Sequence, residues 1–176
     1  MKKINVIGTS GSGKSTFAKK LSKKLNIPYV EMDALFWGKN WSMPNDKVLF
    51  ERLEKALDQD DWVLDGNYTR TTPIKWKKVD TIIWVDLNII QTLYQSISRA
   101  LNRIFTQKEL WPNTGNKESF RNLFSSDSIV WWTIKTYKKN RVKYNTIKSN
   151  PAYEHIEIVH LQSRKECERY LNQIQK

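Results

Sequence analysis

The chain has 176 residues, a length that fits one domain with its own hydrophobic core. It carries 30 Lys and Arg against 18 Asp and Glu, and the net charge of +12 favours anionic partners such as nucleotides, phosphorylated small molecules or nucleic acid. A single cysteine excludes an internal disulfide, the first residues lack the apolar segment of a signal peptide, and no apolar run approaches the roughly 20 residues of a membrane span. We therefore expect a cytoplasmic protein that makes no membrane contact.

The predicted elements alternate between strands and helices. Apolar β-rich runs predict strands, and apolar residues at helical spacing predict helices. Strands are expected at residues 3–7, 29–32, 62–64, 81–85 and 155–159. Helices are expected at about 14–25, 45–58, 89–103, 118–147 with a break near 125–128, and 165–174. This alternation indicates an α/β fold in which helices cover both faces of a parallel sheet.

Two segments between these elements read as loops. Residues 107–117 contain Pro112 and Gly115 and are predicted to form a mobile lid. In residues 36–44, Trp37 and Trp41 either stack on the base of an acceptor or close the core. Since no repeat or interdomain linker interrupts the chain, we expect a single domain over residues 1–176. Its lid and helical insertion are expected at about 104–150.

Residues 8–15 read Gly-Thr-Ser-Gly-Ser-Gly-Lys-Ser, a full match to the phosphate-loop pattern G-x-x-x-x-G-K-[ST] between a predicted strand and a predicted helix. The backbone N–H groups of such a loop, together with the helix N-terminus, hold phosphate. Lys14 is expected to reach the β- and γ-phosphates of ATP, and Ser15 to ligate Mg²⁺. The predicted nucleotide-binding residues of this loop are Gly8, Ser10, Gly11, Ser12, Gly13, Lys14, Ser15 and Thr16.

Three carboxylates follow predicted strands, at the sheet edge where open α/β sheets bind ligands. Asp65 is the candidate for organising Mg²⁺ together with Ser15, and Asp33 for accepting the proton of an acceptor hydroxyl or binding that hydroxyl. Each carboxylate also fits the role of a helix cap, which is the preferred interpretation for Asp86.

The phosphate loop, residues 62–68 (WVLDGNY) and residues 80–87 resemble adenylate-kinase-type P-loop kinases. The resemblance implies a P-loop NTPase fold of three αβα layers, with a five-stranded parallel sheet in the order 2-3-1-4-5. It also implies an acceptor site around the second and third strands, and an arginine-bearing helical lid. More narrowly, the chain resembles the DNA topology modulation (FlaR-related) group in residues 32–37, 65–68 and Trp111-Pro112-Asn113 with Asn116 and Glu118.

One departure bears on the acceptor. Adenylate kinases follow their Asp-Gly with an aromatic residue, a proline and a phosphate-binding arginine, whereas this chain has Asn67, Tyr68, Thr69 and Arg70. Arg70 is the candidate for that arginine, but the proline is absent, so the name adenylate kinase does not apply. Asp33 also resembles the substrate-hydroxyl aspartate of shikimate- and gluconate-type kinases. A nucleotide and a hydroxylated metabolite therefore both stay open as acceptors.

Arginines near the predicted lid are candidates for stabilising the charge of a transferring phosphoryl group. Arg99, Arg103 and Arg121 flank the lid, and the last two form the leading pair. The predicted catalytic residues are Lys14, Asp33, Asp65, Arg103 and Arg121.

The nucleotide base has a weaker signal. By resemblance, residues 162–164 after the fifth strand line the base, with Arg164 as a cofactor-binding residue. Ser163 and Glu166 equally fit a capping box at the start of a helix.

These residues predict an ATP-binding, Mg²⁺-dependent phosphotransferase that acts on a small acceptor. The alternatives are a nucleic-acid-associated NTPase and a nucleotide-gated DNA-binding regulator, both of which fit the positive charge. Nucleic acid is the less favoured partner, because the chain lacks a helix-turn-helix, a zinc-ligand spacing and an RNA-binding signature.

Overall fold

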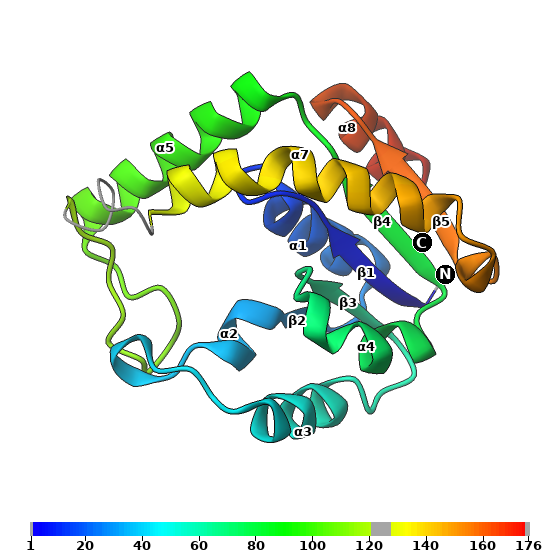
Figure 1. Cartoon of the computed structure of the whole chain (residues 1–176), viewed down its shortest axis with the longest axis horizontal. Helices are drawn as coiled ribbons and strands as arrows, with labels where there is room; N and C mark the ends of the chain where they lie inside the picture. Colours follow the sequence, from blue (N-terminus) through cyan, green and yellow to red (C-terminus); the bar gives the residue numbers. More distant parts are fainter. Residues whose placement is uncertain (1, 121–127, 175–176) are drawn as a thin grey trace.

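The structure is a computed structural model that describes residues 2–120 and 128–174. Its centre is one five-stranded sheet in which every paired strand is parallel to its neighbour, with the order β2-β3-β1-β4-β5 (Figure 1). The strands are β1 (Lys3–Ile7), β2 (Tyr29–Glu31), β3 (Trp62–Asp65), β4 (Thr81–Val85) and β5 (Glu157–Leu161). The predicted strand order is confirmed.

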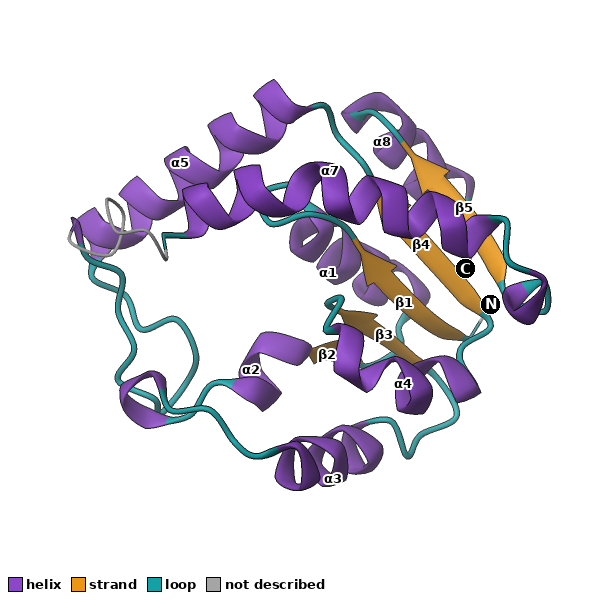
Figure 2. Cartoon of the chain, in the orientation of Figure 1, coloured by secondary structure: helices purple, strands orange, loops and turns teal. Residues whose placement is uncertain are grey.

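Helices cover both faces of the sheet, so the fold has three layers in the order α, β, α (Figure 2). On one face lie α1 (Lys14–Leu25) and α8 (Arg164–Gln173). On the other lie α3 (Asp46–Ala56), α4 (Thr72–Lys78) and α7 (Ile129–Lys148). The predicted P-loop fold class is confirmed in its layers as well as its strand order.

The two faces of β1 divide the core. Ile4 and Val6 pack with α1 and α8, whereas Ile7 packs on the opposite face with Trp62 and Trp84. The division follows from the two-residue repeat of a strand. Because both faces are covered, the strands read as nearly continuous apolar runs, as buried parallel strands do.

Four of the remaining elements lie near the carboxyl end of the sheet, namely α2 (Met32–Phe36), α5 (Ile89–Thr106) and the short 3-10 turns η1 (Lys39–Trp41) and η2 (Thr69–Thr71). A third 3-10 turn, η3 (Pro151–Tyr153), precedes β5 and therefore lies at the amino end of the sheet. α5 and α7 pack against each other, and residues 107–120 run from the end of α5 toward η1 (Figure 1).

Several elements differ from expectation. The helix expected at about 118–147 is described as α7 from Ile129 to Lys148, because residues 116–119 are not helical and residues 121–127 lie outside the described ranges. β2 ends at Glu31, so Asp33 lies in the first turn of α2 and not directly after a strand. α4 carries three lysines in seven residues and has no apolar helical repeat that would reveal it. β5 begins at Glu157 and not at residue 155, because the residues before it belong to the turn in which the Ile156 N–H bonds the Tyr153 carbonyl at 2.9 Å.

Within the described ranges, none of the helices combines the length and the apolar character that crossing a membrane requires.

Candidate active site

The loop after β1 is folded tightly against β4 and α5. Gly8 has a φ of 155°, and a Cβ atom there would lie 2.5 Å from the Val85 carbonyl oxygen. Gly11 has a φ of 84°, and its Cβ would collide with the Thr92 carbonyl oxygen of α5. Only glycine adopts these conformations without strain. The glycines of the pattern therefore bring the loop backbone close to two neighbouring elements.

The N-terminus of α1 presents N–H groups that the helix does not use. Gly13 at the N-cap supplies no side-chain hydrogen bond, and the first turn holds no acidic residue. The Phe17 N–H bonds the Gly13 carbonyl at 3.0 Å, so the N–H groups of Lys14, Ser15 and Thr16 precede the helix's own hydrogen bonds. Because the helix dipole adds partial positive charge here, this end of α1 suits a phosphate group.

Side chains around this end of α1 are also unpaired. Within residues 2–120 and 128–174, no hydrogen bond or ion pair engages the Lys14 ammonium or the Ser15 hydroxyl. In the same ranges the hydroxyl of Ser12 is buried without a partner. Since buried polar groups are nearly always hydrogen-bonded, the Ser12 hydroxyl marks a place for a ligand or an ordered water.

Two helices hold the loop from the side of the predicted lid. From α5, the Arg99 guanidinium donates to the Ser10 hydroxyl at 3.0 Å. From α7, the Asn140 amide donates to the Thr9 hydroxyl at 3.2 Å, and the Thr133 hydroxyl, whose proton is shared with the Ile129 carbonyl at 2.7 Å, lies 3.2 Å from the Ser10 carbonyl. The phosphate loop is thus tied to both helices that flank the lid segment in sequence.

Arg99 is the arginine that reaches the loop. Burial and the nearby Arg103 lower the pKa of Arg99, whereas Asp33 and Asp65 raise it. Arg99 stays charged, since arginine keeps its proton in proteins. Arg103 lies one turn further along α5, and the predicted Arg121 lies outside the described residues. Among the described arginines, Arg99 is the one that bonds the loop and lies within reach of the charges of Asp33 and Asp65.

Asp65 ends β3 beside the phosphate loop, in register with Val6 of β1. It is 4% exposed, and its Oδ2 accepts a hydrogen bond from the Tyr29 hydroxyl at 2.9 Å. Its Oδ1 is buried and has no partner among the described residues. A buried carboxylate oxygen without a donor fits Mg²⁺ or one of its waters, since this ion prefers hard oxygen ligands. The Ser15 hydroxyl is a second oxygen of that kind.

Asp33 faces the same end of the sheet from α2. Its Oδ1 accepts a hydrogen bond from the Tyr68 hydroxyl at 2.8 Å. Burial, followed by the charge of Asp33, raises the pKa of Tyr68, and burial and Asp65 do the same for Tyr29. Both phenols therefore stay protonated donors, and each carboxylate is oriented by one tyrosine.

Arg70, the candidate phosphate-binding arginine, is engaged on the outer side of this region. Its guanidinium lies 2.7 Å from the Asp46 carboxylate in α3 and 5.0 Å from the centre of the Phe36 ring. The Arg70 side chain is 41% exposed, so the pair is a solvated one of small stabilising effect.

The predicted lid loop is docked on the segment that follows β2. The Trp111 indole N–H donates to Glu31 Oε1 at 3.3 Å. The Asn116 side chain bridges two residues of the other loop, because it accepts from the Trp41 N–H at 2.8 Å and donates to the Gly38 carbonyl at 2.9 Å. Residues far apart in sequence thus form one polar seam over the acceptor side.

Three tryptophans fill the space between these loops. The rings of Trp37 and Trp111 are stacked with centroids 6.1 Å apart, and Trp41 meets both rings edge-on at 5.5 and 6.0 Å. Because Trp41 is 36% exposed, these contacts leave both sequence-based interpretations for Trp37 and Trp41 as predictions.

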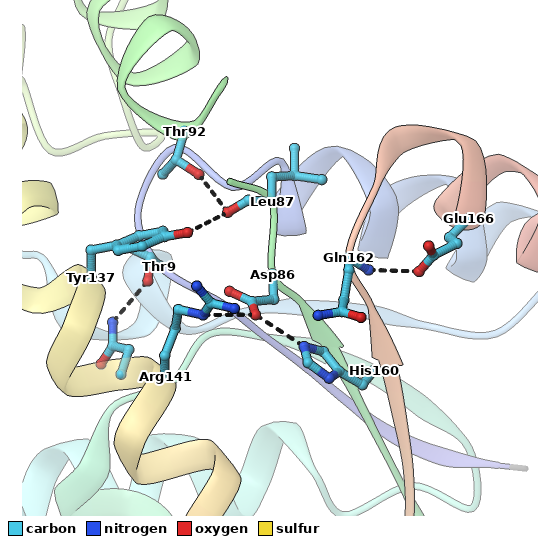
Figure 3. Close-up of polar contacts among 10 residues, drawn as sticks. Thr9, Asp86, Leu87, Thr92, Tyr137, Arg141, His160, Gln162 and Glu166 are labelled. Carbon is cyan, nitrogen blue, oxygen red and sulfur yellow. Dashed lines mark hydrogen bonds and ion pairs between the residues drawn. The ribbon is translucent and has the colours of Figure 1, made fainter. Parts of the chain in front are cut away.

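Asp86 forms a cluster with two basic side chains (Figure 3). Its Oδ2 lies 3.0 Å from Nε2 of His160 in β5 and 3.1 Å from Nε of Arg141 in α7. The interpretation of Asp86 as the cap of the next helix is wrong, because Asn88 caps α5 and accepts from the Gln91 N–H at 2.9 Å. Asp86 instead links Arg141 of α7 and His160 of β5 to the residue that directly follows β4.

The start of α8 is a capping arrangement. The Ser163 hydroxyl accepts from the Glu166 N–H at 3.2 Å, and the Glu166 carboxylate accepts from the Gln162 N–H at 2.8 Å (Figure 3). The capping alternative for this segment is confirmed. Arg164 is the first residue of α8 and is exposed, so its base-binding role stays a prediction.

Some residues of this site carry no signal in the sequence. Tyr29 lies in a strand, and Thr133 and Asn140 lie in a helix whose apolar residues do not line one face. Their partners are distant in sequence, so only the fold brings them to the loop and to Asp65.

Comparison with known proteins agrees with this geometry. The profile of a family described as an AAA domain matches residues 4–83. A curated relative, the bifunctional pantoate ligase/cytidylate kinase of Prochlorococcus marinus (strain MIT 9301), is 30% identical over 97 residues. That match covers 46% of this chain and 18% of the relative, so the chain corresponds to less than a fifth of that protein.

A solved structure extends the comparison to nearly the whole chain. Shikimate kinase from Acinetobacter baumannii in complex with shikimate superposes with a TM-score of 0.57 and 14% identity, over 98% of this chain and 89% of that one. At this identity the match shows the fold. The narrower resemblance to the DNA topology modulation group stays a prediction. The P-loop kinase fold is established, and the relatives found by sequence and by structure are named as kinases.

Proposed function

We propose that the protein is an ATP-dependent, Mg²⁺-requiring phosphotransferase that moves the γ-phosphoryl group to a hydroxyl or phosphate oxygen of a small acceptor. The observation that carries the proposal is the meeting of three parts at one sheet edge. An α1 N-terminus without a side-chain cap, with a Lys14 that no described residue pairs, lies on the same end of the sheet as a buried Asp65 oxygen that no described residue bonds, and Asp33 lies nearby. Phosphate binding alone does not require the second and third parts.

The donor side assigns roles to residues of the loop. Its N–H groups and Lys14 hold the β- and γ-phosphates, and Arg99 lies where charge on the transferring group would be stabilised. Ser15 and Asp65 would hold Mg²⁺, which neutralises phosphate charge when it is bound. The predicted Arg103 and Arg121 stay candidates for a second cation.

The acceptor side assigns the proton. As the acceptor oxygen bonds to the γ-phosphorus, the bond between that phosphorus and the β,γ-bridging oxygen breaks and ADP leaves. A hydroxyl acceptor gives its proton to the Asp33 carboxylate, which Tyr68 orients at 2.8 Å. Because Tyr68 orients the Asp33 carboxylate and the chain lacks the proline of the adenylate-kinase pattern after Asp65-Gly66, we favour a hydroxylated metabolite over a nucleoside monophosphate as the acceptor class.

A screen tests this proposal. Purified protein with ATP and Mg²⁺ is offered nucleosides, nucleoside monophosphates, hydroxylated metabolites or single-stranded DNA, and ADP formation is followed. Stimulation by a small acceptor, lost in Lys14→Ala, is the expected result. Stimulation by DNA alone would establish the nucleic-acid-associated NTPase instead. If the protein bound ATP tightly but formed ADP in none of the mixtures, it would be a nucleotide-gated binding protein. The cytoplasmic location stays a separate prediction.

A further inference from the structure

A second concentration of positive charge lies away from the phosphate loop, between α4 and the C-terminal half of α7. A cavity of about 340 Å³ opens there, and it shares no lining residue with residues 8–15. Its polar wall consists of one lysine, three threonines and an asparagine, which are Lys143, Thr69, Thr72, Thr146 and Asn150. None of the lining residues is acidic.

A buried lysine lies behind this wall. Lys75 is 1% exposed and lies three residues after Thr72 in α4, on the same side of the helix as that lining residue, although Lys75 itself does not line the cavity. Its ammonium donates to the Tyr68 carbonyl at 3.3 Å, a long hydrogen bond that uses one of its three protons. Among the described residues it has no carboxylate partner. A fully buried lysine is rare unless it is paired.

The second lysine reaches the same turn from α7. The Lys143 ammonium donates to the Thr69 hydroxyl at 2.7 Å. Thr69 directly follows Tyr68, whose carbonyl accepts the hydrogen bond from Lys75. Burial lowers the pKa of both lysines, and the charge of Lys143 lowers that of Lys75 further, to about 7. The two ammonium groups therefore repel each other in a poorly solvated space, and no described carboxylate forms an ion pair with either.

We propose that this cavity binds a phosphate monoester, with its phosphate held by Lys143 and the hydroxyl groups of Thr69 and Thr72, while the buried Lys75 ammonium behind the wall adds a second positive charge. A phosphate monoester carries close to two negative charges at neutral pH, so it matches two ammonium groups, whereas a carboxylate matches one. The threonine hydroxyls donate to its remaining oxygens.

The opposite wall explains why an organic ester fits. Trp76, Ile147 and Tyr153 also line the cavity, and they give it an apolar surface beside the charged one. Small-molecule sites combine such apolar walls with a few placed polar groups. The apolar wall accommodates the organic part of the ester, which free phosphate lacks.

Backbone amide NMR on the full chain tests the site, because it separates the cavity from the phosphate loop. Inorganic phosphate and phenyl phosphate are each titrated while the amides of Thr72, Thr146 and Asn150 are followed apart from those of residues 10–16. Saturable shifts of the cavity amides are expected. Tighter binding of phenyl phosphate identifies the ester as the ligand, and equal binding of the two probes would overturn the ester in favour of free phosphate.

Variants assign the shifts to the two lysines. Lys143→Met should weaken binding at the cavity amides by at least about tenfold and leave the loop amides unchanged. Lys75→Met should act in the same direction, and if it does not fold, the half-buried Lys143 carries the test alone. Lys135→Met, on an exposed part of α7, is the matched control. Cavity shifts that do not saturate, or that persist unchanged in Lys143→Met, would overturn the proposal.

Discussion

The donor side and the acceptor side of the candidate site differ in how they are built. On the donor side, the loop of residues 8–15 is local in sequence, and its Lys14 and Ser15 have no partner in the described part of the chain. On the acceptor side, polar groups are paired across long sequence separations, as in the Tyr68–Asp33 and Trp111–Glu31 hydrogen bonds. The donor side is thus open to a generic ligand, whereas the acceptor side is shaped before a ligand arrives.

This difference separates what the two sides determine. Phosphate groups are recognised by N–H groups and cations that many kinases share, so the donor side sets the chemistry. Oriented carboxylates and packed tryptophans leave a specific space, so the acceptor side sets the choice of substrate. Substitutions on the two sides should therefore separate into effects on turnover and effects on acceptor use.

The largest effect should come from the donor side. Lys14→Ala removes the cation expected at the β- and γ-phosphates, and transfer should fall by at least about 100-fold. The measurement is the rate of ADP formation at saturating ATP and acceptor. Lys20→Ala, on the exposed part of α1, is the control and should keep the wild-type rate. Equal rates for the two variants would remove Lys14 from the site.

The next effect tests the acceptor side. Asp33→Asn keeps the shape and the Tyr68 contact region but removes the proton acceptor, so kcat with a hydroxyl acceptor should fall by about 100-fold or more. ATP affinity, measured by calorimetry, should stay unchanged. Asp46→Asn alters another carboxylate near this region and should keep kcat. A loss of ATP binding in Asp33→Asn would place Asp33 on the donor side.

Arg99 links the donor and acceptor sides, because it donates a hydrogen bond to Ser10 and interacts electrostatically with Asp33 and Asp65. Arg99→Lys keeps a charge but loses the planar fork, and kcat should fall by about 10- to 100-fold. Arg103→Lys, one turn along α5, should have a smaller effect in the same assay. A larger fall in kcat for Arg103→Lys than for Arg99→Lys would support Arg103, which the sequence favours, as the catalytic arginine.

The buried Lys75 of α4, whose ammonium donates to the carbonyl of the acceptor-side residue Tyr68, should give the free energy of unfolding a pH dependence that the donor loop does not. Its pKa is lowered to about 7 by burial and by Lys143, so between pH 7 and about 10 the native state binds one proton fewer than the unfolded state. The free energy of unfolding should therefore rise between pH 7 and about 10, by up to about 1.4 kcal/mol per pH unit. This gain in stability should disappear as the pH falls toward 7.

Urea unfolding of Lys75→Met at pH 7, 8, 9 and 10 checks this slope. The variant should be more stable than the wild type near pH 7, and its advantage should shrink as the pH rises. Lys77→Met, which alters an exposed lysine of α4, should parallel the wild type. If the free energies of unfolding of the wild type and Lys75→Met changed identically with pH, Lys75 would keep its charge in the native state.

The smallest effect concerns the seam between the two loops. Trp111→Phe keeps an aromatic ring beside Trp37 but removes the hydrogen bond to Glu31. Because one such bond contributes about 1 kcal/mol, KM for the acceptor should rise by about three- to tenfold while KM for ATP stays constant. Trp131→Phe, at an exposed tryptophan, should leave both constants unchanged. Parallel changes in both KM values would mean that the seam supports the whole site and not the acceptor side.

The same contrast decides what could be predicted from the sequence. The loop of residues 8–15 and the strand ending at Asp65 could be found because their signals are local, a full pattern match and an apolar run followed by Asp-Gly. The strand order came with the family resemblance, and the structure has the same order.

The contacts of the acceptor side could not be predicted in this way. Arg99 and Arg103 share one face of α5 and differ by one turn along it, so which of them reaches the loop depends on where along its length α5 passes the loop, and their spacing leaves this open. Asp33 moved into α2 because β2 ends at Glu31. The pairing of Trp111 with Glu31 joins residues 80 positions apart, and no single-sequence pattern specifies it.

The fate of the γ-phosphoryl group gives the most direct measurement. ATP labelled at the γ-phosphorus is incubated with the protein, Mg²⁺ and the acceptor that stimulates ADP formation most, and the products are separated. We expect the label to appear in a new phosphate ester of the acceptor, in amounts equal to the ADP formed, and to be absent from that ester with Lys14→Ala. Label recovered only as inorganic phosphate, with or without acceptor, would contradict transfer and leave an NTPase.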